Sequence, residues 1–219
     1  MIKAVVFDMD GVLIDSEQLY QDRMIEYLNH IGISLETNTL NKLAGGSKKH
    51  YDAFMKDLFK DRDLTIEKFN QDYLDYYKDN VFDLNKILFD GVREILTYIK
   101  EQGYRLALAS SSEMKYIDEM LDTCHLREYF EEIMSGEMFH ESKPNPEIYL
   151  SMAKHLQLQP SECIAVEDST FGLTSARKAG YYVVAKSDDR FGYDQSIANV
   201  KLNDFEELKG ILKNLNNLN

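Results

Sequence analysis

The sequence predicts an α/β protein: a doubly wound parallel sheet with a helical domain inserted after the first strand. Two observations lead to this prediction. From Gly91 onward, short apolar segments with strand character alternate with amphipathic helical segments, which is typical of parallel strands joined by right-handed crossovers. By contrast, residues 16–84 show helical patterns and no credible strand, so they form a helical block between the first strand and the others.

The first strand is predicted at 4–7, where four apolar residues form a segment too short and too rich in Val and Phe for a helix. Asp8 and Asp10 follow at a spacing of two, which points both carboxylates to one side of an extended segment, and Gly11 allows a sharp turn. Adjacent acids at the end of an apolar strand repel each other, and a divalent cation would offset the repulsion. The same Asp-x-Asp-Gly pattern also occurs in surface turns that carry no chemistry.

The helical block begins at Ser16, a residue type favoured at helix starts, and its first helix carries an apolar stripe up to Gly32. Aromatic and aliphatic residues at helical spacing predict two further helices, over 51–59 and 65–82.

Beyond Gly91, strands and helices alternate, and the strands end in polar residues. The C-terminal segment 214–219, NLNNLN, is expected to fray. Strands are predicted at 105–109, 163–166 and 181–185 and near 200, and a short apolar segment lies at 131–135. Helices are predicted at 92–101, from the serines after 109 to about 121, from 143 through 153, at 172–179 and at 205–215.

The composition is that of a globular protein with a core, since 44% of the residues are hydrophobic and 29% are charged. The formal net charge of −13 disfavours binding to nucleic acid or to an anionic membrane, because no basic surface would neutralise the phosphates. Neither a secretory leader nor an apolar run of membrane-spanning length is recognisable, so we expect a cytoplasmic protein. We also expect the protein to act as a monomer. Cys124 and Cys163 lack disulfide or zinc-ligand spacing and are expected to be small buried hydrophobes.

Polar residues that follow different strands are predicted to meet at one edge of the sheet, because ligands bind beyond the carboxyl ends of parallel strands. Several carboxylates, one hydroxyl and one lysine form a hard-oxygen site that suits Mg²⁺. A phosphate ester is the substrate most consistent with it: one carboxylate can attack phosphorus, a second can protonate the leaving alcohol, and lysine and metal can neutralise the phosphoryl oxygens. The residues expected to converge are Asp8, Asp10, Ser110, Glu167 and Asp168, with Lys143 beside them.

Each of these residues also has a purely structural interpretation. Ser110 and its neighbours could cap a helix, since serine is a preferred cap. Lys143 could be a solvated lysine at a helix start, although a cation is unfavourable there. Glu167 and Asp168 could be ordinary acids at the N-terminus of a helix, which the helix dipole favours.

Four segments in order resemble the four motifs of the haloacid dehalogenase superfamily: FDMDGVLIDSE, LALASSS, SKPNPEIY and AVEDSTFG. The chain is most similar to the phosphatase and β-phosphoglucomutase-like branch, in which a helical cap domain follows the first motif. The resemblance implies a Rossmann-like core at 1–15 and 86–219 and a cap domain at 16–85. It also implies an enzyme, a phosphoric monoester hydrolase with Mg²⁺ as cofactor.

The resemblance further implies a role for each motif residue. Asp8 would be the nucleophile that forms an aspartyl phosphate, and Asp10 would be the general acid and base. Ser110 and Lys143 would bind the phosphoryl group, with Ser111 also in contact with substrate. Dehalogenases generally lack the second aspartate, so Asp10 points to phosphorus chemistry. The residues expected to hold Mg²⁺ are Asp8, Asp10 through its backbone carbonyl, Glu167 and Asp168.

The cap departs from that of the phosphomutases at three positions. The chain carries Tyr20 where they carry a histidine, Lys48 where they carry an arginine and Asp75 where they carry a lysine. Tyr20 and Lys48 are still expected to contact substrate, whereas Asp75 would repel a phosphate. A mutase must hold a second phosphate, so the departures predict a phosphatase of small phosphorylated metabolites, sugar phosphates foremost. A phosphomutase is the alternative, and a non-catalytic phosphate-binding protein is a third.

Overall fold

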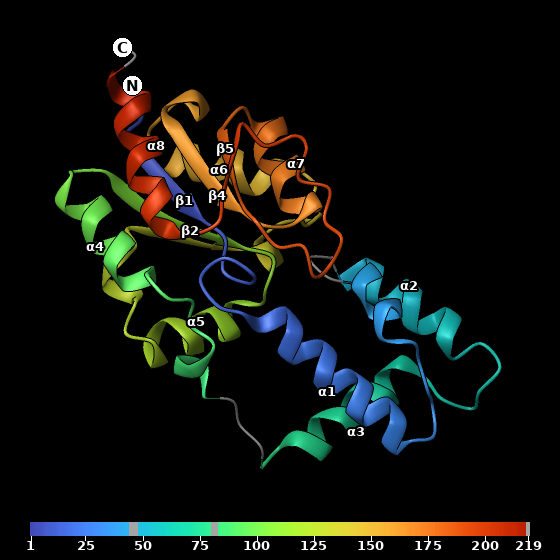
Figure 1. Ribbon diagram of the computed structural model, residues 1–219. Coiled ribbons are helices and arrows are strands. Elements are labelled where there is room, and N and C mark those ends of the chain that lie inside the picture. The colour runs from blue at the N-terminus through green and yellow to red at the C-terminus, as the bar shows by residue number, and fades with distance from the viewer. Residues whose placement is uncertain (44–47, 80–82, 218–219) are drawn as a thin grey trace.

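The computed structural model describes residues 1–43, 48–79 and 83–217, and a six-stranded parallel sheet with helices on both faces forms its core (Figure 1). This architecture confirms the predicted doubly wound α/β fold. In sheet order, the strands are β3 (Glu132–Ser135), β2 (Arg105–Ser110), β1 (Ala4–Phe7), β4 (Cys163–Glu167), β5 (Tyr182–Lys186) and β6 (Val200–Leu202).

Eight α-helices and five short 3₁₀ helices lie in the described part of the chain. The α-helices are α1 (Ser16–His30), α2 (Lys48–Leu58), α3 (Ile66–Tyr77), α4 (Val92–Glu101), α5 (Met114–Thr123), α6 (Glu147–His155), α7 (Thr170–Ala179) and α8 (Phe205–Asn217). The 3₁₀ helices are η1 (Thr37–Lys42), η2 (Leu84–Lys86), η3 (Arg127–Tyr129), η4 (Gly136–Met138) and η5 (Pro160–Glu162).

The central strand β1 is apolar at every position because both faces of the sheet are covered. Val5 and Phe7 belong to the core layer that includes side chains of α4, α5 and α8, while Ala4 and Val6 belong to the opposite layer, under α6 and α7. Successive side chains of a strand point to opposite faces, so each layer receives every second residue.

The strand order reverses at β1, which pairs with β2 on one side and with β4 on the other. The connection that follows β1 leads to β2 and the connection that follows β4 leads to β5, so the two run to opposite sides and their loops part at the carboxyl edge between β1 and β4. In open α/β sheets this is where ligands bind. The topology thus places Asp8, directly after β1, at the centre of the expected site.

Helices α1, α2 and α3 lie apart from the sheet (Figure 1) and pack around a hydrophobic cluster of their own. The chain leaves and re-enters the sheet domain along two adjacent segments, joined by hydrogen bonds from Asp15 N to Ile87 O (2.7 Å) and from Phe89 N to Leu13 O (3.0 Å). The helical insertion is thus confirmed, while the boundaries 1–15, 16–85 and 86–219 stay a prediction. The buried members of the cluster are Tyr27, Leu28, Ile33, Met55, Phe59, Phe69 and Tyr77.

Two expectations for the helices were wrong. Helix α3 ends at Tyr77, short of the predicted 65–82, of which 80–82 lie outside the described residues. The tail does not fray before position 217: Asn216 accepts a hydrogen bond from Ile2 N (3.0 Å) and donates one to the Tyr104 hydroxyl (2.7 Å), which ties α8 to the sheet domain. Within the described ranges, no helix has the length and apolar character needed to cross a membrane.

Candidate active site

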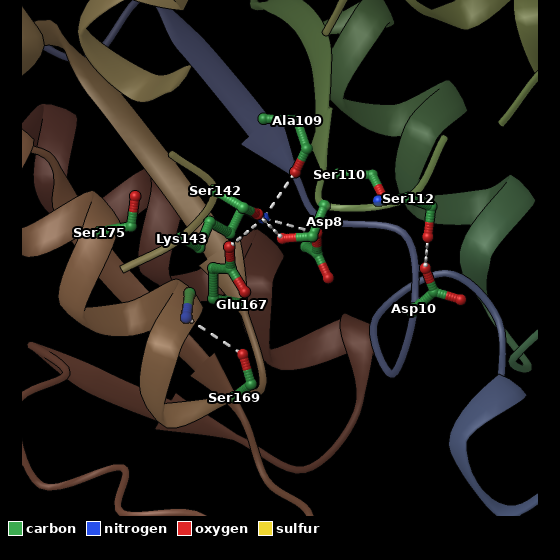
Figure 2. A network of polar contacts seen from close by, with 12 residues as sticks. Asp8, Asp10, Ala109, Ser110, Ser112, Ser142, Lys143, Glu167, Ser169 and Ser175 are labelled. Carbon is green, nitrogen blue, oxygen red and sulfur yellow. Dashed lines mark hydrogen bonds and ion pairs between the residues drawn. The ribbon is translucent and has the colours of Figure 1, made fainter. Parts of the chain in front are cut away.

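A buried lysine joins three strands at the carboxyl edge of the sheet (Figure 2). The Lys143 ammonium donates to Asp8 Oδ1, to Glu167 Oε1 and to the Ala109 carbonyl oxygen, each at 2.7 Å. Only 4% of the lysine side chain is exposed. Three acceptors match the three donors of the ammonium group, so the cation is fully satisfied away from water. The interpretation of Lys143 as a solvated lysine is therefore wrong.

The acids around this lysine are electrostatically crowded. Burial, and then the charge of Glu167, raise the pKa of Asp8 to about 8, although Lys143 opposes the shift. Burial also raises the pKa of Asp168 well above its usual value, with Asp8 and Glu167 adding to the effect. Burial alone would lower the pKa of Lys143, but the two carboxylates outweigh it and raise the pKa, so the lysine stays charged. One lysine does not balance three buried acids.

The carboxylates of Asp8, Glu167 and Asp168 are close enough to hold one metal ion, with an oxygen of each within 4.8 Å of the others. Glu167 Oε2 is buried and has no hydrogen-bond partner among the described residues. An unpaired buried carboxylate oxygen costs free energy unless a cation or a donor meets it. Hard oxygen ligands, surplus negative charge and this free oxygen together fit Mg²⁺.

Two glycines make room for two of these acids. Gly11 has the left-handed φ of +74°, and a β-carbon there would lie 2.0 Å from Asp168 Oδ2. A β-carbon on Gly172, in the first turn of α7, would lie 1.9 Å from Glu167 Oε2. Any other residue at either position would displace the neighbouring carboxylate.

Asp10 lies beside Ser112, apart from the Lys143 group (Figure 2). Its carboxylate accepts hydrogen bonds from Ser16 Oγ at 2.6 Å and from Ser112 Oγ at 2.7 Å. Ser16 is the first residue of α1, so this contact links the sheet domain to the helical insertion. The expected metal contact of Asp10, through its backbone carbonyl, stays a prediction.

The serine segment after β2 does not cap a helix, because α5 begins after Glu113. Ser110 is buried at the strand end, and its hydroxyl accepts from Ser112 N at 3.0 Å. Ser111 is exposed, and its hydroxyl is 3.1 Å from that of Ser142. Both serines are thus at the site edge, and their contacts with substrate stay a prediction.

The acids after β4 also precede their helix instead of lying in its first turn. Ser169 is the N-cap of α7, and its hydroxyl accepts from Gly172 N at 3.1 Å. Glu167 is the last residue of β4, and Asp168 follows it directly. Glu167 therefore belongs to the strand, while Asp168 lies directly before the N-cap of α7.

The three cap positions that depart from the phosphomutases differ in what the structure shows of their side chains. Tyr20 lies on α1 with 44% of its surface exposed, and burial followed by the charge of Asp10 raises the pKa of its hydroxyl. Asp75 is exposed on α3. Lys48 begins α2, but its side chain lies outside what the structure describes.

Sequence reasoning missed two residues that support the acids. The Tyr149 hydroxyl, from α6, donates to Glu167 Oε1. The Gln195 amide donates to the backbone carbonyls of Asp168 and Lys186, both at 2.7 Å, and so fastens the loop after β5 to the site. Tyr149 falls within the SKPNPEIY segment and could have been found there, whereas nothing near Gln195 in the sequence signals its partners.

The fold and this site define a haloacid dehalogenase-like hydrolase. A profile of that family matches residues 5–186, and the chain therefore belongs to it. The predicted superfamily is confirmed. The predicted class of enzyme, a phosphoric monoester hydrolase, is confirmed by this membership together with relatives that are themselves named as phosphatases.

Among the relatives, hexitol phosphatase B of Escherichia coli is 32% identical over 216 residues, covering 94% of each chain. The phosphorylated carbohydrates phosphatase of Thermotoga maritima is 30% identical over 186 residues, covering 82% of each. The crystal structure of β-phosphoglucomutase from Clostridium difficile superimposes with a TM-score of 0.79 at 22% identity, over 100% of this chain and 99% of that one. At that identity the likeness shows the shared fold alone.

Proposed function

We propose that this protein is a Mg²⁺-dependent phosphatase that hydrolyses small phosphorylated sugars through an aspartyl phosphate on Asp8. The observation that carries the proposal is the buried group in which Lys143 binds Asp8 and Glu167 while Asp168 completes a set of three metal-ligating oxygens. The two phosphatase relatives supply the substrate class, because one is named for hexitols and the other for phosphorylated carbohydrates.

In the first half-reaction, an Asp8 carboxylate oxygen attacks phosphorus and the bond from phosphorus to the ester oxygen breaks. Asp10 gives the leaving alcohol its proton. In the second, Asp10 takes a proton from water, which attacks the phosphorus, releases inorganic phosphate and restores the Asp8 carboxylate. Lys143 neutralises charge on the reacting groups throughout.

Mg²⁺, when bound by Asp8, Glu167, Asp168 and the backbone carbonyl of Asp10, would supply further positive charge for the phosphoryl oxygens. Tyr20, on the first helix of the insertion, would contact the sugar. Ser110, Ser111 and Lys48 complete the proposed substrate contacts.

A phosphatase is favoured over a phosphomutase by the cap. Asp75 offers an exposed carboxylate where a mutase of this branch carries a lysine, and a carboxylate repels a second phosphate. A non-catalytic phosphate-binding protein is disfavoured, because mere binding has no need of the acid Asp10 beside the nucleophile.

The test is phosphate release from hexitol and sugar phosphates with Mg²⁺, run beside an assay for conversion of β-glucose 1-phosphate to glucose 6-phosphate. We expect release without isomerisation. Isomerisation would favour a phosphomutase, and no activity in either assay would favour a non-catalytic phosphate-binding protein. Asp8→Asn is the control for contaminating phosphatase.

The proposal includes a cytoplasmic setting and no nucleic-acid or membrane partner, which the net charge of −13 supports. The monomeric state is proposed with it, and gel filtration with light scattering tests that state directly.

A further inference from the structure

The Tyr149 side chain is wholly buried, and its hydroxyl donates a hydrogen bond to Glu167 Oε1. Its ring packs edge to face against Tyr181 with centroids 5.1 Å apart, and the Lys143 ammonium lies 5.3 Å from its centroid. The ring therefore has no freedom to turn away, and the hydroxyl is a fixed donor beside the acidic cluster.

Hydrogen bonds to Glu167 are distributed unevenly between its two oxygens. Oε1 accepts from both Lys143 and Tyr149, whereas Oε2 accepts from no described residue and lies against Gly172. The terminal torsion of a glutamate is broad and roughly two-fold, so a carboxylate held at one point turns easily. Two donors on one oxygen restrict that rotation.

Lys143 alone does not provide this restriction. Its ammonium is shared with Asp8 and the Ala109 carbonyl, and it sits at the end of a flexible four-carbon stem. If Glu167 rotates, Lys143 retains its other two acceptors. The Tyr149 hydroxyl sits on a rigid, packed ring, so its hydrogen bond is lost when Glu167 rotates and therefore favours one orientation of the carboxylate.

We propose that Tyr149 is a positioning residue: its hydroxyl holds Glu167 in the orientation that presents this glutamate to a divalent cation. The inference rests on the metal site of the proposed function. Mutation of a residue that hydrogen-bonds to a metal ligand and orients it typically lowers metal affinity roughly 10- to 100-fold. We therefore expect Tyr149→Phe to weaken Mg²⁺ binding by about that factor.

The chain offers a matched control in Tyr181. Its hydroxyl donates to the backbone carbonyl of Tyr149 at 2.8 Å, and its ring is the other half of the same pair. Tyr181→Phe removes an equally buried hydroxyl from the same cluster but leaves the Glu167 bond intact. Both variants should lose similar stability, and only Tyr149→Phe should lose Mg²⁺ affinity.

The experiment is calorimetric titration of Mg²⁺ into the wild type, both tyrosine variants, Glu167→Gln and the double variant Tyr149→Phe/Glu167→Gln. The rise in melting temperature on adding Mg²⁺ is a second readout. In the Glu167→Gln background, Tyr149→Phe should have no further effect on affinity, because the hydroxyl acts through the carboxylate.

An unchanged dissociation constant in Tyr149→Phe would overturn the inference and leave the proposed function standing. An equal loss in Tyr181→Phe would overturn it too, since ring packing would then explain the effect. Full additivity in the double variant would show that the hydroxyl does not act through Glu167. Failure of the wild type to bind Mg²⁺ would instead remove the metal site, and the proposed function with it.

Discussion

Gly172→Ala is the substitution whose outcome depends most directly on the site geometry. In a helix, alanine is normally favoured over glycine by about 1 kcal/mol. Here the new β-carbon would lie 1.9 Å from Glu167 Oε2 and 2.2 Å from its Cδ, distances that real β-carbons do not show. The carboxylate must therefore move by about 1 Å or more to reach even a tight contact of 3.0 Å.

That movement disturbs the bonds of Glu167 to Lys143 and Tyr149. A hydrogen bond to a charged group contributes about 1.5–3 kcal/mol. Set against the helix propensity, the loss of one or two such bonds predicts a net destabilisation of about 0.5–5 kcal/mol. Mg²⁺ binding should weaken as well, since Glu167 leaves its place.

Gly210→Ala is the matched control. Gly210 is exposed in α8, and a β-carbon there would meet nothing within 4 Å. It should gain about 1 kcal/mol of stability. Urea unfolding without Mg²⁺ and calorimetric titration with Mg²⁺ compare the two variants. If Gly172→Ala is as stable as Gly210→Ala and binds Mg²⁺ like the wild type, the described packing of Glu167 is incorrect.

Three further predictions test the remaining charges. Asp8→Asn should abolish phosphate release while circular dichroism shows an intact fold, and normal turnover would exclude Asp8 as the nucleophile. Lys143→Met should lower the free energy of unfolding by about 3–5 kcal/mol, because Asp8 and Glu167 stay buried without their cation; an unchanged urea midpoint would contradict this. Arg190→Ala should cost about 1–3 kcal/mol at neutral pH, since it removes the bonds of Arg190 to the buried carboxylate of Asp188 and to the more exposed carboxylate of Asp15. Burial raises the pKa of Asp188, but Arg190 outweighs it and lowers the pKa below its usual value, so the part of this difference that comes from Asp188 should be present at neutral pH and disappear as the pH falls through the lowered pKa. A difference that persists in acid would show that packing, and not charge, is responsible.

The fold was predictable because its pattern is local. A strand buried on both faces must be apolar throughout, as Ala4–Phe7 is, and a helix covering one face must carry a stripe, as Val92–Glu101 does. Boundaries were less predictable where tertiary contacts decide them. The bonds of Asn216 extend α8 through a segment whose composition favours fraying.

For the site, the chemical groups could be read from the sequence alone: acids at the ends of β1 and β4, serines at the end of β2, and Lys143. Polar residues at the strand ends could be recognised as one site because parallel strands bring their carboxyl ends together. The motifs also specified the family and hence the class of reaction.

The pairing of these groups depends on the three-dimensional arrangement of the elements. Lys143 binds Asp8 across 135 positions of the chain, and Asp10 meets Ser112 across 102. Tyr149 reaches Glu167 because side chains of α6 and β4 share one core layer, and Gly172 matters because its missing side chain is the space that Glu167 occupies. Hydrogen bonds and close packing depend on ångström-scale placement of atoms from separate elements, and no local pattern of residues encodes that placement.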